Sequence, residues 1–282
     1  MISETARDRR GVLRSSIERP FALIEAGRTV REAQFEAQIL GPRNVPSGIT
    51  GLDTFLDGGL PDRSLLLILG ETGSHYETFV QQVMINHLSN GGRAAYYLTE
   101  NLAVDIRQKM EIFRWSLKEY IGRGDMVFIN LRTPTLEEIA NLMPQILIEG
   151  LNLTVSKGLN SLKSDILVKT REERWIILEL GQLLREYGLN DVLSLLHYWR
   201  AAVRVYGGIH FALLPIGVHQ DSEVNAIEHL ADGVIEFYLR DGPREFDNIM
   251  VIRKLPGVRK ALSLNFTVSE NGLIIETAAR IS

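Results

Sequence analysis

The chain of 282 residues contains no cysteine, which excludes disulfide bonds and thiolate metal sites. It also lacks an apolar run of the ~18 residues that a membrane-spanning helix needs, and its N-terminus lacks the apolar block of a signal peptide. We therefore expect a cytoplasmic protein with no membrane partner. Hydrophobic residues still make up 45% of the chain, which is ample for a large buried core.

An excess of positive charge is also missing. The chain has 31 Lys and Arg against 35 Asp and Glu, which gives a net charge of -4. Between Arg204 and Arg240 there is no Lys or Arg, whereas the same segment contains acidic residues such as Asp221 and Glu223. Because a protein neutralises DNA phosphates with cations, we expect no nucleic-acid binding by this segment.

One stretch resembles a phosphate-binding loop in its context. A short apolar run, residues 65–69, ends in a glycine-bearing turn and continues into an amphipathic pattern that begins near Phe79. Strand, loop and helix in this order are typical of a P-loop, whose template is Gly-x-x-x-x-Gly-Lys-Ser/Thr. When the template starts at Gly70, the candidate nucleotide-binding positions are Gly70, Glu71, Thr72, Gly73, Ser74, His75, Tyr76 and Glu77.

Three template residues are missing from this loop. His75 stands where the second glycine belongs, Tyr76 where the lysine belongs, and Glu77 where the Mg²⁺-binding hydroxyl belongs. At an effective dielectric near 20, two unit charges about 4 Å apart interact by roughly 4 kcal/mol, which is half of the ~8 kcal/mol of a micromolar complex. The substitutions predict that ordinary Mg-ATP binding is lost, although Gly73, Ser74 and the next helix N-terminus still offer N–H groups to an anion.

The residues before the loop carry two further motifs, Gly51-Leu52-Asp53 and Gly58-Gly59-Leu60-Pro61. Together they resemble the opening of the KaiC-like branch of the RecA superfamily of P-loop ATPases, and Ala231-Asp232-Gly233-Val234-Ile235 is similar to a later strand of that family. The resemblance covers roughly residues 45–278. It implies an α/β, RecA-like P-loop fold with a mostly parallel central sheet flanked by helices and a C-terminal antiparallel hairpin.

The resemblance also divides the chain into parts. We expect an N-terminal helical extension over residues 1–44 and a RecA/KaiC-like domain over residues 45–282. Residues 150–170 contain apolar positions without a clean period, and we expect an insertion there. A helix is expected from Thr135 onward, where apolar residues recur at helical spacing.

The same resemblance assigns candidate catalytic residues. Glu100 follows a strand over residues 94–98, at the place where the family carries a pair of glutamates that activate water. Glu179 ends an apolar strand at the Walker B position, where the family uses Asp. Lys254 matches the lysine of a Lys-x-Arg element that reaches the nucleotide of a neighbouring subunit, but Pro256 stands at the Arg position and cannot stabilise developing phosphate charge.

An ATPase of this type needs the second loop glycine, the lysine, the hydroxyl and the trans arginine, and this sequence lacks all four. We expect a pseudo-ATPase that acts as a regulatory or scaffolding subunit of an oligomer, without a resident cofactor. The resemblance implies an archaeal-type signalling or assembly context, with further copies or a related active RecA/KaiC-like ATPase as partner. Two alternatives stay open. One is an ATP-binding protein or weak ATPase that holds ATP and Mg²⁺ in a rearranged P-loop, and the other is a RecA/RadA-type recombinase paralogue in DNA repair.

The substituted loop side chains suggest two arrangements. In the first, His75 and Tyr76 fill the vacated phosphate cavity, and the Tyr76 hydroxyl pairs with backbone groups of the loop. In the second, His75, Glu77, Glu100 and Glu179 converge near the former Mg²⁺ position and bind a divalent cation. We assign no metal site from the sequence alone.

Overall fold

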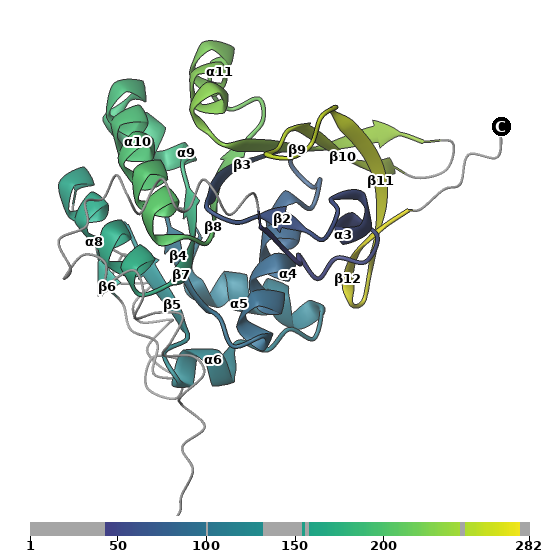
Figure 1. Cartoon of the computed structure of the whole chain (residues 1–282), viewed down its shortest axis with the longest axis horizontal. Helices are drawn as coiled ribbons and strands as arrows, with labels where there is room; N and C mark the ends of the chain where they lie inside the picture. Colours follow the sequence, from purple (N-terminus) through teal and green to yellow (C-terminus); the bar gives the residue numbers. More distant parts are fainter. Residues whose placement is uncertain (1–42, 100, 132–153, 156–157, 243–245, 277–282) are drawn as a thin grey trace, which may run out of the picture. The chain divides into compact units, whose positions relative to one another are not determined.

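The computed structural model describes residues 43–99, 101–131, 154–155, 158–242 and 246–276. These residues form a ten-stranded sheet of order β12-β11-β10-β9-β3-β8-β7-β4-β5-β6, with helices on both of its faces (Figure 1). Its strands are β3 (Ser64–Gly70), β4 (Arg93–Leu98), β5 (Met126–Asn130), β6 (Thr154–Val155), β7 (Arg174–Glu179), β8 (Ile209–Pro215), β9 (Gly233–Asp241), β10 (Phe246–Lys254), β11 (Leu262–Ser269) and β12 (Gly272–Ile275). A separate two-stranded sheet pairs β1 (Asn44–Val45) with β2 (Leu60–Pro61).

The central strand β3 is buried at all seven of its positions. It pairs in parallel with β8 and with β9, and the parallel pairing continues from β8 through β7, β4, β5 and β6. A continuous apolar run is what a parallel strand covered on both faces requires, so residues 65–69 specify this position. The last three strands are antiparallel, and β11 with β12 forms the expected C-terminal hairpin. The expected α/β fold is confirmed.

Helices cover the two faces of the sheet over separate apolar cores. The first core lies under α3 (Leu52–Phe55), α4 (Tyr76–Ser89), α5 (Ala103–Ile112) and α6 (Lys118–Gly122). The second lies under α8 (Leu159–Arg171), α9 (Gly181–Tyr187), α10 (Leu189–Tyr206) and α11 (Asp221–Leu230). No helix within the described ranges is both long and apolar enough to cross a membrane.

The motifs before β3 have structural roles. The Asp53 carboxylate accepts hydrogen bonds from the Ser47 N–H at 2.8 Å and the Ser47 hydroxyl at 2.6 Å, which fixes the turn that leads into α3. Gly59 has a φ of 121°, and a side chain there would overlap the carbonyl oxygen of Val45. Only glycine fits a position with this φ and this close backbone approach.

The Asp232 carboxylate of the Ala-Asp-Gly motif joins two elements. It accepts hydrogen bonds from Arg200 Nε and Arg204 Nη2 of α10, both at 2.8 Å, and from the Leu65 N–H of β3 at 3.1 Å. Because two guanidinium groups and one backbone N–H converge on this carboxylate, Asp232 fixes α10 against the start of the central strand.

The segment expected as an insertion is regular in the part that the structure describes. Residues 159–171 form α8, whose Leu162, Ile166 and Thr170 are buried four residues apart on one face. The spacing of these three residues is a helical signal that the sequence analysis did not use. The helix expected from Thr135 and residues 1–42 of the expected N-terminal extension lie outside the described residues.

Two histidines pack against tryptophan side chains, and of these His87 is half-buried and His210 is fully buried. The His87 ring stacks on Trp175 with 3.8 Å between the ring centroids, and His210 Nδ1 accepts a hydrogen bond from Trp199 Nε1 at 3.0 Å. Burial lowers the pKa of His87 to about 4 and that of His210 to about 3. Both rings are therefore neutral in the folded protein at physiological pH.

We expect His87 to make the protein sensitive to acid. The unfolded chain protonates this ring near pH 6.5 and the folded chain only near pH 4, so the stabilisation is complete above pH 6.5 and is lost as the pH falls toward 4. His87→Phe keeps an aromatic ring against Trp175 but removes the titrating group. Between pH 6.5 and pH 4, the free energy of unfolding of this variant should therefore fall by about 3 kcal/mol less than that of the wild type.

Urea unfolding at a series of pH values measures this difference. His197→Gln, which changes an exposed histidine of α10, is the matched control and should follow the wild type. A His87→Phe protein with an unchanged pH dependence would contradict the assignment.

Candidate functional site

The candidate site lies at the carboxyl edge of the parallel strands, where open α/β sheets bind their ligands. Gly70 ends β3, pairs with Pro215 of β8 and Phe237 of β9, and leads through a short loop into α4. Glu179 ends β7, the strand on the far side of β8 from β3, and Thr99 follows β4, the next strand. Together with neighbouring residues they line a cavity of about 60 Å³, whose lining residues are Tyr76, Glu77, Thr99, Asn101, Glu179, Gly181, Leu213 and Pro215.

The loop is closed on itself by its own hydrogen bonds. The Ser74 N–H and hydroxyl both donate to the Glu71 carbonyl, at 3.1 and 2.7 Å. Glu71 in turn fastens the loop to β9, because its N–H donates to the Phe237 carbonyl at 3.0 Å and its carboxylate accepts from the Leu239 N–H at 2.9 Å. The N–H of the buried Ser74 is therefore satisfied by a hydrogen bond within the loop and is not available to a ligand.

His75 occupies a backbone conformation that favours glycine. Its φ of 61° and ψ of 20° lie in the left-handed region, at the position immediately before α4. The P-loop template has a glycine here, and a side chain in this conformation costs roughly 1–2 kcal/mol. Partial burial lowers the pKa of His75, which favours the neutral imidazole.

The Tyr76 ring packs directly on Gly70. A Cβ atom at position 70 would overlap Cγ and Cδ1 of this ring. Burial raises the pKa of Tyr76 strongly, and the nearby negative charges of Glu77 and Glu179 raise it further, so the phenol stays protonated. Within the described residues no hydrogen bond joins the Tyr76 hydroxyl to the loop backbone, so the expected pairing is not observed. Tyr76 lines the same cavity as Glu77 and Glu179.

Glu77 forms an ion pair that the sequence analysis missed. Its carboxylate lies 2.9 Å from Lys109 Nζ of α5. The buried Ala103, Ile106 and Met110 make the inner face of this helix at three- and four-residue spacing, a pattern that predicts a helix but not its neighbour. The site therefore does contain a lysine, and it neutralises Glu77.

The Glu179 carboxylate is held by polar groups of the chain that follows β4. It accepts hydrogen bonds from Asn101 Nδ2 at 2.9 Å, from the Thr99 hydroxyl at 3.2 Å and from the Thr99 N–H at 3.3 Å. Burial raises the pKa of Glu179, the hydrogen bonds from Asn101 and Thr99 oppose this shift, and the Glu77 charge adds to it. These contacts fix the carboxylate at the end of β7 and join β7 to β4.

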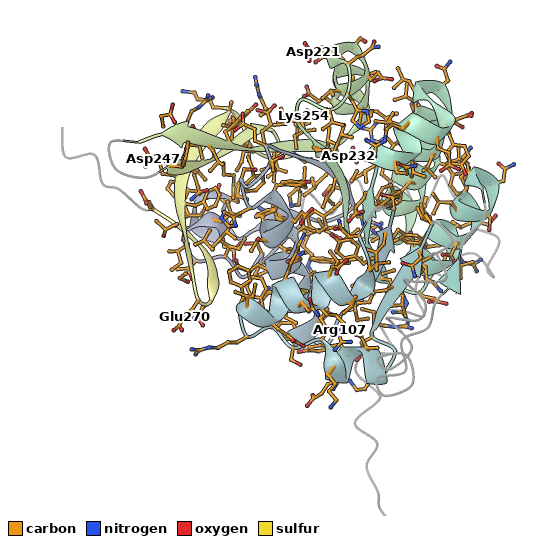
Figure 2. The ribbon with its side chains drawn as sticks, turned by 180° about the vertical axis from the view of Figure 1, so that it is seen from behind. Arg107, Asp221, Asp232, Asp247, Lys254 and Glu270 are labelled. Carbon is orange, nitrogen blue, oxygen red and sulfur yellow. The ribbon has the colours of Figure 1, made fainter. Side chains whose placement is uncertain are left out.

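Lys254 lies away from the loop of its own chain. It pairs across β10 and β9 with Val234, which is level with Leu67, three residues before Gly70 on β3. Its Nζ donates to the Glu228 carbonyl at 2.8 Å. Burial and then the neighbouring Arg200 charge lower its pKa, whereas Asp232, seen beside it in Figure 2, raises it. Glu100 lies outside the described residues.

The hypothesis of a divalent cation site is not supported by the described part of the chain. No three His, Asp or Glu side chains among these residues form a group that could hold a metal ion. The three described members of the set that the sequence suggested are His75, Glu77 and Glu179. Glu77 is paired with Lys109, and Glu179 accepts hydrogen bonds from Thr99 and Asn101.

Comparison with known proteins decides the family. The family model of the KaiC ATPase matches residues 45–280. The chain belongs to the KaiC ATPase family. Its curated relatives include a UPF0273 protein of Thermotoga maritima, 22% identical over 83% of this chain and 96% of the relative, and one of Pyrococcus horikoshii, 24% identical over 83% and 94%.

A solved structure agrees with this membership at the level of the fold. The crystal structure of a KaiC-like protein from Pyrococcus horikoshii matches this KaiC-family chain with a TM-score of 0.62, over 83% of the chain and 99% of that structure. The sequence identity is 19%, so the likeness concerns the fold alone. The family expected from the two motifs before β3 is confirmed, and the chain is a KaiC-like member of the RecA-type P-loop ATPases.

Proposed function

We propose that this KaiC-family chain is a non-catalytic subunit that works by association and not by ATP turnover. The observation that carries the proposal is the Tyr76 ring, which lies on Gly70 at the position of the P-loop lysine. An uncharged ring thus stands where the template has a cation, and it lines the same cavity as Glu77 and Glu179, whose charges raise its pKa.

The size of the cavity supports this proposal. A pocket that buries a drug-sized ligand usually has about 300–1,000 Å³, whereas the cavity beside Tyr76 has about 60 Å³. That volume holds a few water molecules. A triphosphate could enter only after the Tyr76 ring had left Gly70, so the residues present do not fit Mg-ATP in this arrangement.

The charge of the site supports the proposal as well. Glu77 and Glu179 both face the cavity, and Lys109 is committed to Glu77 at 2.9 Å. A phosphoryl-transfer site instead presents cations and a bound metal to the transferred phosphate. The surroundings of Glu179 serve to hold β7 and β4 together, which is a structural task that needs no nucleotide.

Exposed apolar surface supports assembly. Phe55 of α3 is 42% exposed and lines a cavity of about 540 Å³. Leu255 and Val258 line the same cavity, and the unpaired cations Arg259 and Lys260 stand at it within the described part of the chain. A concave apolar surface with a charged rim is typical of a protein–protein contact. The partner we propose is a second copy of this chain or a related active KaiC ATPase.

Restoring the P-loop template tests the loss of turnover. The variant His75→Gly, Tyr76→Lys, Glu77→Thr recreates Gly-Lys-Thr and removes the ring from Gly70. We expect it to gain stability with Mg-ATP, by about 2.7 kcal/mol at a hundredfold excess over Kd, which is roughly 5–10 °C in Tm. The wild type should not hydrolyse ATP. ATP hydrolysis by the wild type that is lost in Glu179→Gln or Lys109→Gln would contradict the proposal.

The assembly is tested by light scattering over a range of protein concentrations. We expect the wild type to be larger than a monomer and Phe55→Ser to weaken the association at least about tenfold, which is 1.4 kcal/mol. Ile112→Ser removes an exposed apolar side chain of α5 and is the matched control. A wild type that stays monomeric alone and in mixture with an active KaiC-family ATPase would rule the assembly out.

A further inference from the structure

A third cavity, separate from the two described above, lies at the opposite edge of the sheet from the P-loop. It has about 360 Å³ and is bordered by the first residues of the parallel strands and by the turns that precede them. Arg93 begins β4, Trp175 is the second residue of β7, and Gly208 immediately precedes β8. The proposed function gives this cavity no role.

One wall of the cavity is aromatic. Trp175 and His87 lie parallel, with an interplanar angle of 8° and 3.8 Å between their centroids, and Tyr206 lines the cavity at the end of α10. His87 Nε2 is buried and has no hydrogen-bond partner within the described part of the chain. Trp175 is only 6% exposed and supports the His87 ring, so the half-buried His87 and Tyr206 rings provide the accessible part of this wall. Flat ring surfaces of this kind suit a planar heterocycle.

Three arginines surround the same cavity. Arg63 Nη1 donates to the carbonyls of Arg204 and Val205 at 2.9 and 3.0 Å, and Arg93 Nη1 donates to the Glu172 carbonyl at 3.1 Å. Carbonyl oxygens thus orient two guanidinium groups, although Arg63 also lies near the Asp62 carboxylate and Arg93 near that of Glu172. Arg43 lines the cavity with no ion pair among the described residues.

Two carboxylates line the cavity against these three cations, Asp62 and Glu173. The Asp62 carboxylate accepts a hydrogen bond from the Gly208 N–H at 2.8 Å and lies 4.0 Å from Arg63 Nε. The negative charge of Asp62 is thus partly compensated by the N–H of the turn before β8. Positive charge is in excess here, in a protein whose net charge is -4. Oriented guanidinium groups are the donors that best match a phosphate.

We propose that this cavity binds a small phosphorylated molecule with a planar heterocycle, of the size of a nucleoside monophosphate. The heterocycle lies against the aromatic wall, and the phosphate lies among Arg43, Arg63 and Arg93. The cavity volume falls within the range of small-molecule sites. Because Arg63 binds the end of α10 and Arg93 binds the end of α8, a ligand here also contacts the residues that anchor two helices.

Calorimetry with AMP as the probe tests this site. We expect AMP to bind the wild type with a Kd in the micromolar to millimolar range, and adenosine and inorganic phosphate each to bind at least about tenfold more weakly. Arg93→Gln and Arg43→Gln should each weaken AMP binding by about tenfold or more, which corresponds to one lost charged hydrogen bond. Arg43 is exposed and makes no side-chain hydrogen bond or ion pair within the described residues, so its substitution should leave the fold intact.

Two controls separate this cavity from other sites. Arg114→Gln changes an exposed arginine that is paired with Glu270, and Lys109→Gln changes the lysine at the P-loop edge. Both should bind AMP as the wild type does. The proposal is overturned if AMP does not bind at millimolar concentration, if both cavity variants bind AMP within about twofold of the wild type, or if Lys109→Gln abolishes the binding.

Discussion

The packing of the Tyr76 ring on Gly70 constrains the whole carboxyl edge of this protein. Gly70 ends the central strand, and the ring covers the place where its missing side chain would be. In this closed form the ring fills the space beside the first glycine of the loop. The left-handed His75 before α4 and the Ser74 hydrogen bonds to Glu71 hold the loop in the same closed form.

Two carboxylates, Glu77 and Glu179, line the cavity beside this loop. A P-loop ATPase presents cations at this place. Glu179 keeps its position through hydrogen bonds from Thr99 and Asn101, and Glu77 forms an ion pair with Lys109. Each carboxylate is therefore satisfied by the protein itself, without a metal ion or a nucleotide.

Much of the fold, but only part of the candidate site, could be predicted from the sequence. The buried run of β3 has no polar residue between Leu65 and Leu69, and such a run fits only the middle of a parallel sheet. The role of Lys109 could not be predicted, because its contact with Glu77 spans 32 residues and depends on where α5 packs. The place of the Tyr76 ring depends equally on groups outside its own helix, Gly70 and Glu179. In contrast, α8 was missed although Leu162, Ile166 and Thr170 carry a helical period.

The two edges of the sheet differ in chemistry. The carboxyl edge presents a small acidic cavity, whereas the amino edge presents a larger cavity with three arginines and an aromatic wall. The account of the carboxyl edge depends on the contact between Tyr76 and Gly70, and a double-mutant cycle measures that contact directly. Gly70→Ala should cost roughly 1–3 kcal/mol by overpacking. The cost should nearly vanish in a Tyr76→Gly background, because that substitution removes the ring and also the Cβ atom of residue 76, which would lie 2.6 Å from the new Cβ. Gly122→Ala, at an open position of α6, should cost nothing. An equal cost of Gly70→Ala in both backgrounds would show that the ring does not close the loop.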